Sequence, residues 1–246
     1  MPSRWTWLSW LALAVAVCAI ALLALAGASY RTGWLPLGTA LGVMLTWAAY
    51  LGIAASVLAV VALVLNARRG STSAKAAAVL AFVIGAVSVN IPWQWQRTAR
   101  SVPPIHDIST DTITPPGYVE VAAIRREQRV PNGLDYSADV AALQRTGYPD
   151  LAPAFLGAPP ADAYRRALEL VRARGWEVVA ADETSHRIEA TDTTYWFGFK
   201  DDIAIRVSPI PDGTSRVDVR SVSRVGRSDV GTNAKRIRAF LADLGR

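Results

Sequence analysis

The first side chains that could do chemistry follow a long uncharged segment. They are His106, Asp107 and Asp111, with Ser109 and Thr110 between them. One imidazole and two carboxylates can share a proton or hold a divalent metal ion. Their spacing matches no standard metal-ligand signature, and Asp, Ser and Thr beside prolines also form ordinary turns. We therefore take His106, Asp107 and Asp111 as candidate catalytic residues, with turn formation as the alternative.

A second polar segment, residues 220–233, joins an expected strand to the last expected helix. The two-residue repeat of a strand places Asp218, Arg220 and Arg224 on one face. The glycines permit tight turns, and the first turn of the helix offers free N–H groups to an anion. A phosphate, a carboxylate or a lipid headgroup could bind here. The predicted ligand-binding residues are Arg220, Ser223, Arg224, Gly226, Asp229 and Asn233.

The same segment also admits a purely structural interpretation. Asp229 or Asn233 would cap the helix. The arginines would then pair with Asp201, Asp202 or Asp218. An aromatic turn and the two acids after it supply pocket candidates, although aromatic residues in turns more often close the edge of a core. These pocket candidates are Trp196, Phe199, Asp201 and Asp202.

Known cofactor and nucleophile motifs are absent from the sequence. It contains no P-loop, no Gly-x-Gly-x-x-Gly and no Gly-x-Ser-x-Gly. Cys18, the single cysteine, lies in an apolar run, which excludes an intrachain disulfide and a zinc–cysteine cluster. We therefore expect no metal and no cofactor.

The elements that must position these groups lie in the second half of the sequence. The spacing predicts helices over 160–174, ending at Gly175, and over 233–244. It predicts strands over 176–180, 187–194, 200–208 and 215–224. This order predicts an α+β domain over 118–246, with an antiparallel sheet of about four strands and helices on one face. Residues 97–117 are expected to form an extended connector, and residues 118–160 an irregular wrap with a short helix near 137–145.

The first hundred residues carry seven basic side chains and no acidic ones, whereas the rest carry 19 basic and 20 acidic residues. Three long uncharged stretches predict an α-helical membrane anchor over 1–96, since about 20 apolar residues span a bilayer. The spans are expected near 8–28, 41–65 and 76–93. Helices of a soluble core are one alternative, and a cleaved signal peptide is another for the first span. Because the positive charge belongs to this half, a nucleic-acid-binding domain is excluded.

The placement of basic residues predicts the orientation of the spans. Arg4 and three basic residues of the 66–75 loop lie on one side, and only Arg31 lies in the other loop. The positive-inside rule then places the N-terminus in the cytoplasm and the C-terminal domain in the periplasm, at a bacterial inner membrane. No Asp, Glu, Lys, Arg or His lies within a span, which argues against an ion pump. Three glycines could allow close helix packing: Gly38, Gly42 and Gly52.

Several polar blocks together resemble the DUF1499 family. These blocks are Pro104–Asp111 with Pro115 and Pro116 after it, Phe197–Asp202, Arg220–Gly226 and Asp229–Asn233. The resemblance covers roughly residues 103–245 and implies a domain of undetermined function, so it names no substrate. Other members open the domain with a cysteine-containing motif, which this sequence lacks. What the resemblance carries over is that these polar blocks are the hallmark of the family.

We expect a membrane-anchored periplasmic accessory or ligand-binding module of the bacterial cell envelope. Its partners would be the lipid bilayer and, near Arg220 and Arg224, an anionic lipid or glycan or another membrane protein, but no nucleic acid. One alternative is an envelope enzyme that unites His106, Asp107 and Asp111 with those arginines in one pocket. A further alternative is a structural partner whose helices bind another membrane protein.

Overall fold

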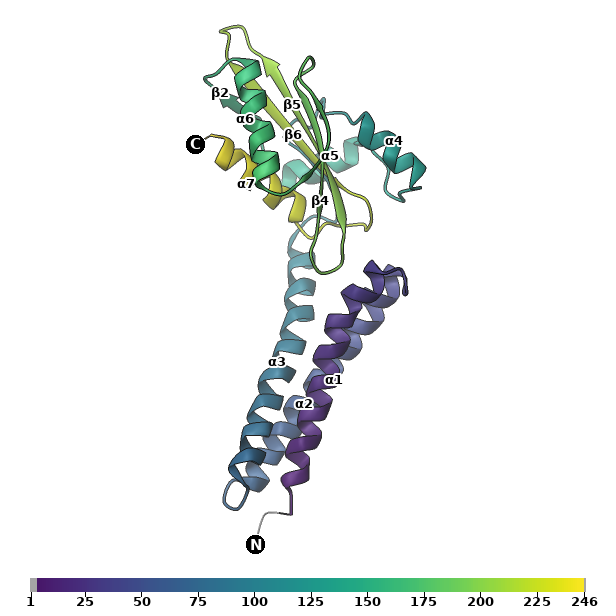
Figure 1. The fold of residues 1–246 in the computed structure, drawn as a ribbon, viewed down its shortest axis with the longest axis vertical. Coiled ribbons are helices and arrows are strands. Elements are labelled where there is room, and N and C mark those ends of the chain that lie inside the picture. Colours follow the sequence, from purple (N-terminus) through teal and green to yellow (C-terminus); the bar gives the residue numbers. More distant parts are fainter. Residues whose placement is uncertain (1–3, 246) are drawn as a thin grey trace. The chain divides into compact units, whose positions relative to one another are not determined.

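The computed structural model describes residues 4–245, which form two compact units. The first unit holds the residues up to 97 together with 196–198. The second unit holds residues 98–195 and those from 199 onward. In Figure 1 the purple and blue helices belong to the first unit, and the green and yellow elements belong almost entirely to the second.

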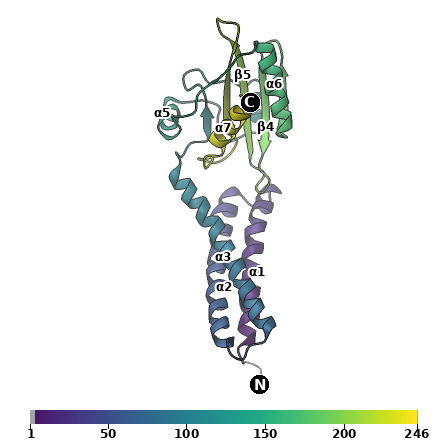
Figure 2. The ribbon, with the colours of Figure 1, turned by 90° about the vertical axis from the view of Figure 1, so that its left-hand side faces the viewer.

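Three long apolar helices form the first unit. They are α1 (Thr6–Arg31), α2 (Leu45–Asn66) and α3 (Thr72–Ser101), and each is long and apolar enough to cross a membrane. A six-residue π-helix, η1 (Thr39–Met44), leads directly into α2. The three helices run side by side in both Figure 1 and Figure 2. This confirms the three predicted apolar helices.

Small residues line the seams between these helices, while many larger apolar side chains face outward. Lipid tails are as apolar as the side chains, so burial from water does not drive helix association inside a bilayer. Small side chains instead let the helix backbones approach closely and make van der Waals contact. One such cluster comprises Ala12 and Ala16 of α1, Ala55 and Ala59 of α2, and Ala81 of α3.

Two glycines bring the backbones of α2 and α3 into direct contact. A Cβ atom at Gly52 would lie 2.7 Å from the carbonyl oxygen of Gly85, and one at Gly85 would lie 2.6 Å from that of Gly52. Gly38 and Gly42, by contrast, have open space where a Cβ atom would stand. The prediction of close packing therefore holds at Gly52 and is wrong at Gly38 and Gly42.

The second unit is built on an antiparallel sheet. Four strands lie where the spacing predicts them: β3 (Glu177–Asp182), β4 (Arg187–Thr193), β5 (Lys200–Pro209) and β6 (Ser215–Ser223). The helices α6 (Pro160–Ala173) and α7 (Thr232–Leu244) are the two predicted ones, and α5 (Ala138–Gly147) covers the short helix expected near 137–145. The α+β fold class is thus confirmed.

Two further strands make the expected number of about four too low. β1 (Asp107–Ser109) and β2 (Ala154–Leu156) both pair antiparallel with β6, in a sheet of order β1-β6-β5-β4-β3. Each has three residues, which is too short to show a two-residue hydrophobic alternation. β1 lies inside the connector expected over 97–117, and α3 continues to Ser101, so this segment is not extended throughout.

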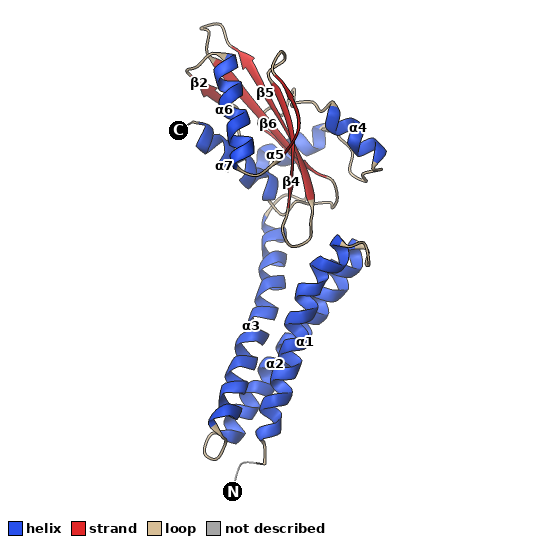
Figure 3. Ribbon diagram, in the orientation of Figure 1, coloured by secondary structure: helices blue, strands red, loops and turns tan. Residues whose placement is uncertain are grey.

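The two faces of the sheet differ in character. Figure 3 shows α6 and α7 on one side of the sheet and α4 (Glu120–Glu127) on the other. On the α4 side, Glu189 of β4 accepts hydrogen bonds from the backbone N–H groups of Val119 and Val121, at 2.8 and 2.7 Å. Helices therefore cover both faces, not one. The sequence did not predict a helix on this face, because α4 buries a charged residue, Arg125, as well as the apolar Val121. The apolar face packs the following residues with α6 and α7: Ile203, Ile205, Val217, Val219, Ile237 and Phe240.

We expect Gly52→Ala to lower the thermal unfolding midpoint of the full chain in detergent. The new methyl group would meet the Gly85 backbone, and overpacking of this kind costs about 1–3 kcal/mol. Gly42→Ala is the matched control, because it brings the same gain in helix propensity, up to about 1 kcal/mol, without a clash. Circular dichroism on heating measures both variants. A higher midpoint for Gly52→Ala than for Gly42→Ala would contradict the backbone contact.

Candidate functional site

The face of the sheet opposite α6 and α7 carries several ion pairs, among them Arg187 with Glu189 and three clusters around arginines in or next to β6. The two-residue repeat of β6 turns Arg216 and Arg220 to this face, and Arg224 follows just beyond the strand. Each arginine meets a carboxylate from a separate segment of the chain. We call this surface, with its three clusters, the charged face.

The central cluster joins Arg220 of β6 to Asp107 of β1. The guanidinium donates two parallel hydrogen bonds to the carboxylate, from Nε to Oδ1 at 3.0 Å and from Nη2 to Oδ2 at 2.6 Å. The two residues are buried, with 4% and 3% of their surface exposed. Further N–H groups of Arg220 donate to the carbonyl oxygens of Pro116 and Leu134. Arg220 is thus bound on several sides by its own chain.

Two tyrosine rings complete the enclosure of Arg220. The rings of Tyr118 and Tyr136 have their centroids 5.3 and 5.5 Å from the guanidinium carbon, within the range of cation–π attraction. Burial raises the pKa of both hydroxyl groups, so they stay neutral. Burial disfavours the charge of Arg220, but the hydrogen bonds and charge of Asp107 outweigh it and raise the arginine pKa. The arrangement therefore holds the ion pair in its charged form.

The second cluster lies at the end of β6, around Asp202 of β5. Arg224 donates to both carboxylate oxygens, at 2.9 and 2.7 Å, and Arg125 of α4 donates to Oδ2 at 2.6 Å. The hydroxyl of Thr191 donates to Oδ1 at 2.7 Å. A carboxylate offers about four lone-pair positions, and these four hydrogen bonds use them. Asp202 therefore has no lone pair to spare for a ligand.

The third cluster surrounds Asp111, at the other end of β6. Arg216 and Arg206 donate to its Oδ2 at 2.8 and 3.2 Å, and both arginines also bond to Asp218. Burial acts to raise the pKa of Asp111, but two backbone N–H groups of its own turn and the two arginines lower it below the ordinary value. A lowered pKa is the opposite of what a general acid needs near neutral pH.

Asp229 lies two residues before Gly231, the N-cap of α7, and satisfies N–H groups at this end of the helix. Its carboxylate accepts hydrogen bonds from the N–H groups of Gly231 and Asn233, at 2.9 and 2.6 Å. Burial raises the pKa of Asp229. The preceding turn is strained, because Val230 has a φ of +54°, a region that β-branched residues rarely adopt. The N–H groups that were expected to bind an anion are thus occupied by a side chain of the same loop.

Asn233 ties the start of α7 to the sheet on the face opposite the charged one. Its side-chain oxygen accepts from the hydroxyl of Ser221 at 2.7 Å. Its amide nitrogen donates to the hydroxyl of Ser223 and to the carbonyl oxygen of His106, both at 3.0 Å. Next to it, Arg236 pairs with Asp201 at 2.7 Å. These contacts fix a helix on a sheet and account for the polar residues of this block.

The two predicted polar segments do meet, but as hydrogen-bonded strands. β1 lies beside β6, and the candidates Asp107 and Asp111 bind different arginines. His106 directly precedes Asp107 but contacts a different part of the chain: its Nδ1 lies 3.4 Å from the carbonyl oxygen of Arg227. The structure therefore does not bring His106, Asp107 and Asp111 to one point. Gly226, with a φ of +92°, serves the turn after Arg224.

The pocket candidates are likewise separated. Phe199 lies in the β4–β5 turn, where its backbone bonds to Thr194 at 2.8 Å in both directions. Trp196 belongs to the helical unit. Asp201 and Asp202 point to opposite faces of β5 and bind different arginines. Within residues 4–245, no group of three or more His, Cys, Asp or Glu side chains is placed to hold a metal ion.

Sequence reasoning missed several residues that complete the charged face. The amide of Gln144 in α5 pairs with the backbone of Ser109, accepting at 2.9 Å and donating at 2.6 Å, and so closes the outer edge of β1. The other missed residues are Arg125, Tyr118 and Tyr136. None of the four belongs to a sequence motif, and their partners lie far away along the chain, so the sequence does not single them out.

The geometry defines an α+β domain with one face that is apolar apart from the Arg236–Asp201 pair and one face rich in ion pairs, preceded by three apolar helices. A family model for proteins of unknown function, DUF1499, matches residues 107–244. The match covers more than half of the chain, so this chain belongs to the DUF1499 family, which confirms the resemblance. No curated protein matches the chain.

We expect Asp107→Asn to lower the free energy of unfolding of the full chain by about 3–5 kcal/mol, because it leaves Arg220 buried without its counter-charge. The matched control is Asp150→Asn, which breaks a pair with Arg238 whose side chains are 56% and 41% exposed. An exposed pair contributes about 0.2–1 kcal/mol. Urea unfolding followed by tryptophan fluorescence compares the two. Equal losses would show that the Asp107–Arg220 pair does not organise the domain.

Proposed function

We propose that this chain is a membrane-anchored accessory module of the bacterial cell envelope that binds an anionic partner through its α+β domain. The three apolar helices would hold it in the inner membrane. The basic residues of the α2–α3 loop support a cytoplasmic position for that loop, and three crossings then leave the domain in the periplasm. The family match names no activity, so the proposal rests on the side chains of the domain.

The anionic partner needs basic groups other than the two predicted ones. Arg220 and Arg224 direct their N–H groups to internal acceptors and are buried. Around Arg224, however, three segments carry basic side chains that are exposed or half-exposed: Arg129, Lys200 and Arg227. No ion pair involves these three within the described part of the chain. We call them the basic patch.

Backbone hydrogen bonds hold the three segments of the basic patch together. The N–H of Arg224 donates to the carbonyl of Lys200 at 2.9 Å, and the N–H of Asn132 donates to the carbonyl of Arg224 at 3.3 Å. The side-chain amide of Asn132 also donates to the carbonyl of Gly226 at 2.9 Å, next to Arg227. The backbone of the buried Arg224 thus links the segments that carry the exposed basic residues.

The backbone at Arg129 is the observation that carries the proposal. Arg129 follows the C-cap of α4 and has a φ of +51°. Its N–H bonds to the carbonyl of Arg126, and that of Val130 bonds to the carbonyl of Arg125, the pattern in which glycine normally ends a helix. The same ending on α6 does use glycine, at Gly175. An arginine held at a position that costs about 1 kcal/mol suggests that its side chain is used.

The enzyme alternative finds less support. It requires His106, Asp107 and Asp111 to act together with Arg224, and each carboxylate is instead engaged by a separate arginine. A structural partner of another membrane protein would use the helices and is compatible with the basic patch.

We expect Arg129→Gly to raise the free energy of unfolding by about 1 kcal/mol, because glycine adopts positive φ without strain. We expect the same change to weaken binding of the detergent-solubilised full chain to heparin, a polyanion, by about tenfold, the equivalent of one charge-assisted contact of about 1.4 kcal/mol. Arg166→Gln, on the exposed side of α6, removes the same charge elsewhere and serves as the control. Equal heparin binding by the two variants would remove the basic patch as the binding surface.

The periplasmic placement predicts a labelling pattern in intact cells. In a Cys18→Ala background, a membrane-impermeant maleimide should label Glu183→Cys in the β3–β4 turn and leave Ser73→Cys at the start of α3 unlabelled. Both positions are exposed in the described structure. Permeabilised cells, in which both sites should react, provide the control. Labelling of Ser73→Cys alone in intact cells would reverse the proposed orientation.

A further inference from the structure

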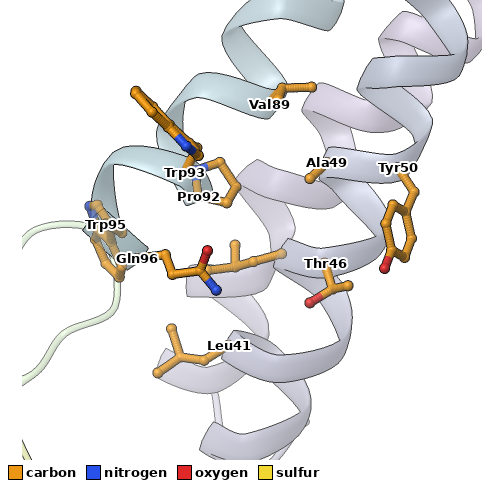
Figure 4. A pocket seen from close by; sticks show the side chains of 10 residues that line it. Leu41, Thr46, Ala49, Tyr50, Val89, Pro92, Trp93, Trp95 and Gln96 are labelled. Atoms are coloured by element: carbon orange, nitrogen blue, oxygen red, sulfur yellow. The ribbon is translucent and has the colours of Figure 1, made fainter. Parts of the chain in front are cut away.

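A hollow follows the seam between α2 and α3 in the helical unit. Its outer part, of about 360 Å³, lies between η1, the start of α2 and the far turns of α3. A second part, of about 560 Å³, continues along the same two helices and shares Val89 and Trp93 with the first. Figure 4 shows the outer part, with Gln96 of α3 extending into the gap that faces α2. We call the two parts together the α2–α3 groove.

The helix geometry explains the outer part of the groove. Gly52 and Gly85 bring the two backbones together, the inner part lies beside this contact, and the outer part lies beyond it. Pro92 lies inside α3 and lines the outer part, and a proline removes a helix hydrogen bond and bends the helix. On the facing side, the wide π-turn of η1 carries Leu41 into the lining. Residues of α3 on one side and of η1 on the other thus form the outer part of the groove.

The lining of both parts is mostly apolar and carries a few polar groups. The inner part includes Ser56 and Asn90, and the outer part includes Tyr50 and Gln96 at the end of the groove near Arg97. From Phe82 to Gln96, α3 rises about 21 Å at about 1.5 Å per residue. The hydrocarbon of one leaflet is about 15 Å thick, half of the bilayer core. The groove is therefore long enough for the acyl chain of one leaflet.

The end of the groove near Gln96 carries positive charge only. Arg97 follows Gln96, and its guanidinium carbon lies 5.6 Å from the centroid of the Trp93 ring, which lines both parts of the groove. The first hundred residues contain no Asp or Glu to compete for it. An arginine beside the mouth of an apolar groove favours a lipid whose headgroup has a net negative charge, because no ammonium group of the lipid repels the guanidinium there.

We propose that the α2–α3 groove is a binding site for one anionic phospholipid. One acyl chain lies along Val89 and Phe82, and the headgroup phosphate meets Arg97. The site stands on the helical unit alone, so it is independent of the basic patch of the α+β domain. The lipid makes the anchor selective for negatively charged membrane rather than only for an apolar layer.

Native mass spectrometry of the full chain in detergent, titrated with phosphatidylglycerol or phosphatidylcholine carrying the same acyl chains, tests the proposal. We expect the first phosphatidylglycerol to bind about tenfold more tightly than phosphatidylcholine, which corresponds to about 1.4 kcal/mol. Arg97→Gln should abolish this preference. Arg69→Gln, in the α2–α3 loop at the opposite end of these helices, removes the same charge and should retain it.

A second pair of variants tests the groove itself. Ala86→Phe places a ring in the inner part and should weaken the first binding of both lipids, whereas Val17→Phe, on the exposed side of α1, should not. Thermal unfolding of each variant checks the fold, and if Ala86→Phe is unfolded the arginine pair decides. Equal affinity for the two lipids, equal effects of Arg97→Gln and Arg69→Gln, or full binding by a folded Ala86→Phe would each overturn the proposal.

Discussion

Buried charge on one face of the sheet constrains the rest of the α+β domain. Moving an ion out of water costs several kcal/mol, and attraction to a counter-ion offsets this cost only when geometry and hydrogen bonding are nearly complete. The Arg220–Asp107 pair meets this demand with two parallel hydrogen bonds, two carbonyl acceptors and two tyrosine rings. Because Asp107 lies on β1, the pair also determines where the strand that opens the domain sits.

The segment over 111–136 packs over the ion pairs of the charged face and contributes mainly polar contacts to them. Tyr118 donates its hydroxyl to the backbone carbonyls of Asp202 and Arg220, at 3.0 and 3.3 Å. Glu189 accepts hydrogen bonds from N–H groups at the start of α4, where the helix dipole favours a negative charge. The cover is imperfect, since Nε of Arg125 is buried without a hydrogen-bond partner. A polar cover of this kind tolerates few changes, because each lost partner leaves a buried charge unsatisfied.

The sequence contains enough information for the periodic elements and too little for the polar cover. The apolar helices, the four longer strands and the helices α6 and α7 each repeat a pattern over many residues, so their types are predictable. β1, β2 and α4 are short, and their positions depend on contacts with distant segments, such as that of Asp107 with Arg220. For the same reason, the sequence leaves two roles open for Arg220 and Arg224, ion pairing and ligand binding, and cannot decide between them. Only the three-dimensional structure shows that Asp202 binds Arg224 and Arg125 together.

Function is therefore to be sought on the surfaces that the ion pairs support, not in the pairs themselves. The double variant Asp107→Leu with Arg220→Met tests this claim most directly, since a buried ion pair can often be replaced by apolar residues without loss of stability. We expect the full-length double variant to unfold nearly as the unmodified chain does and to bind heparin with unchanged affinity. A folded double variant that no longer binds heparin would contradict the account and would place Arg220 in the binding site.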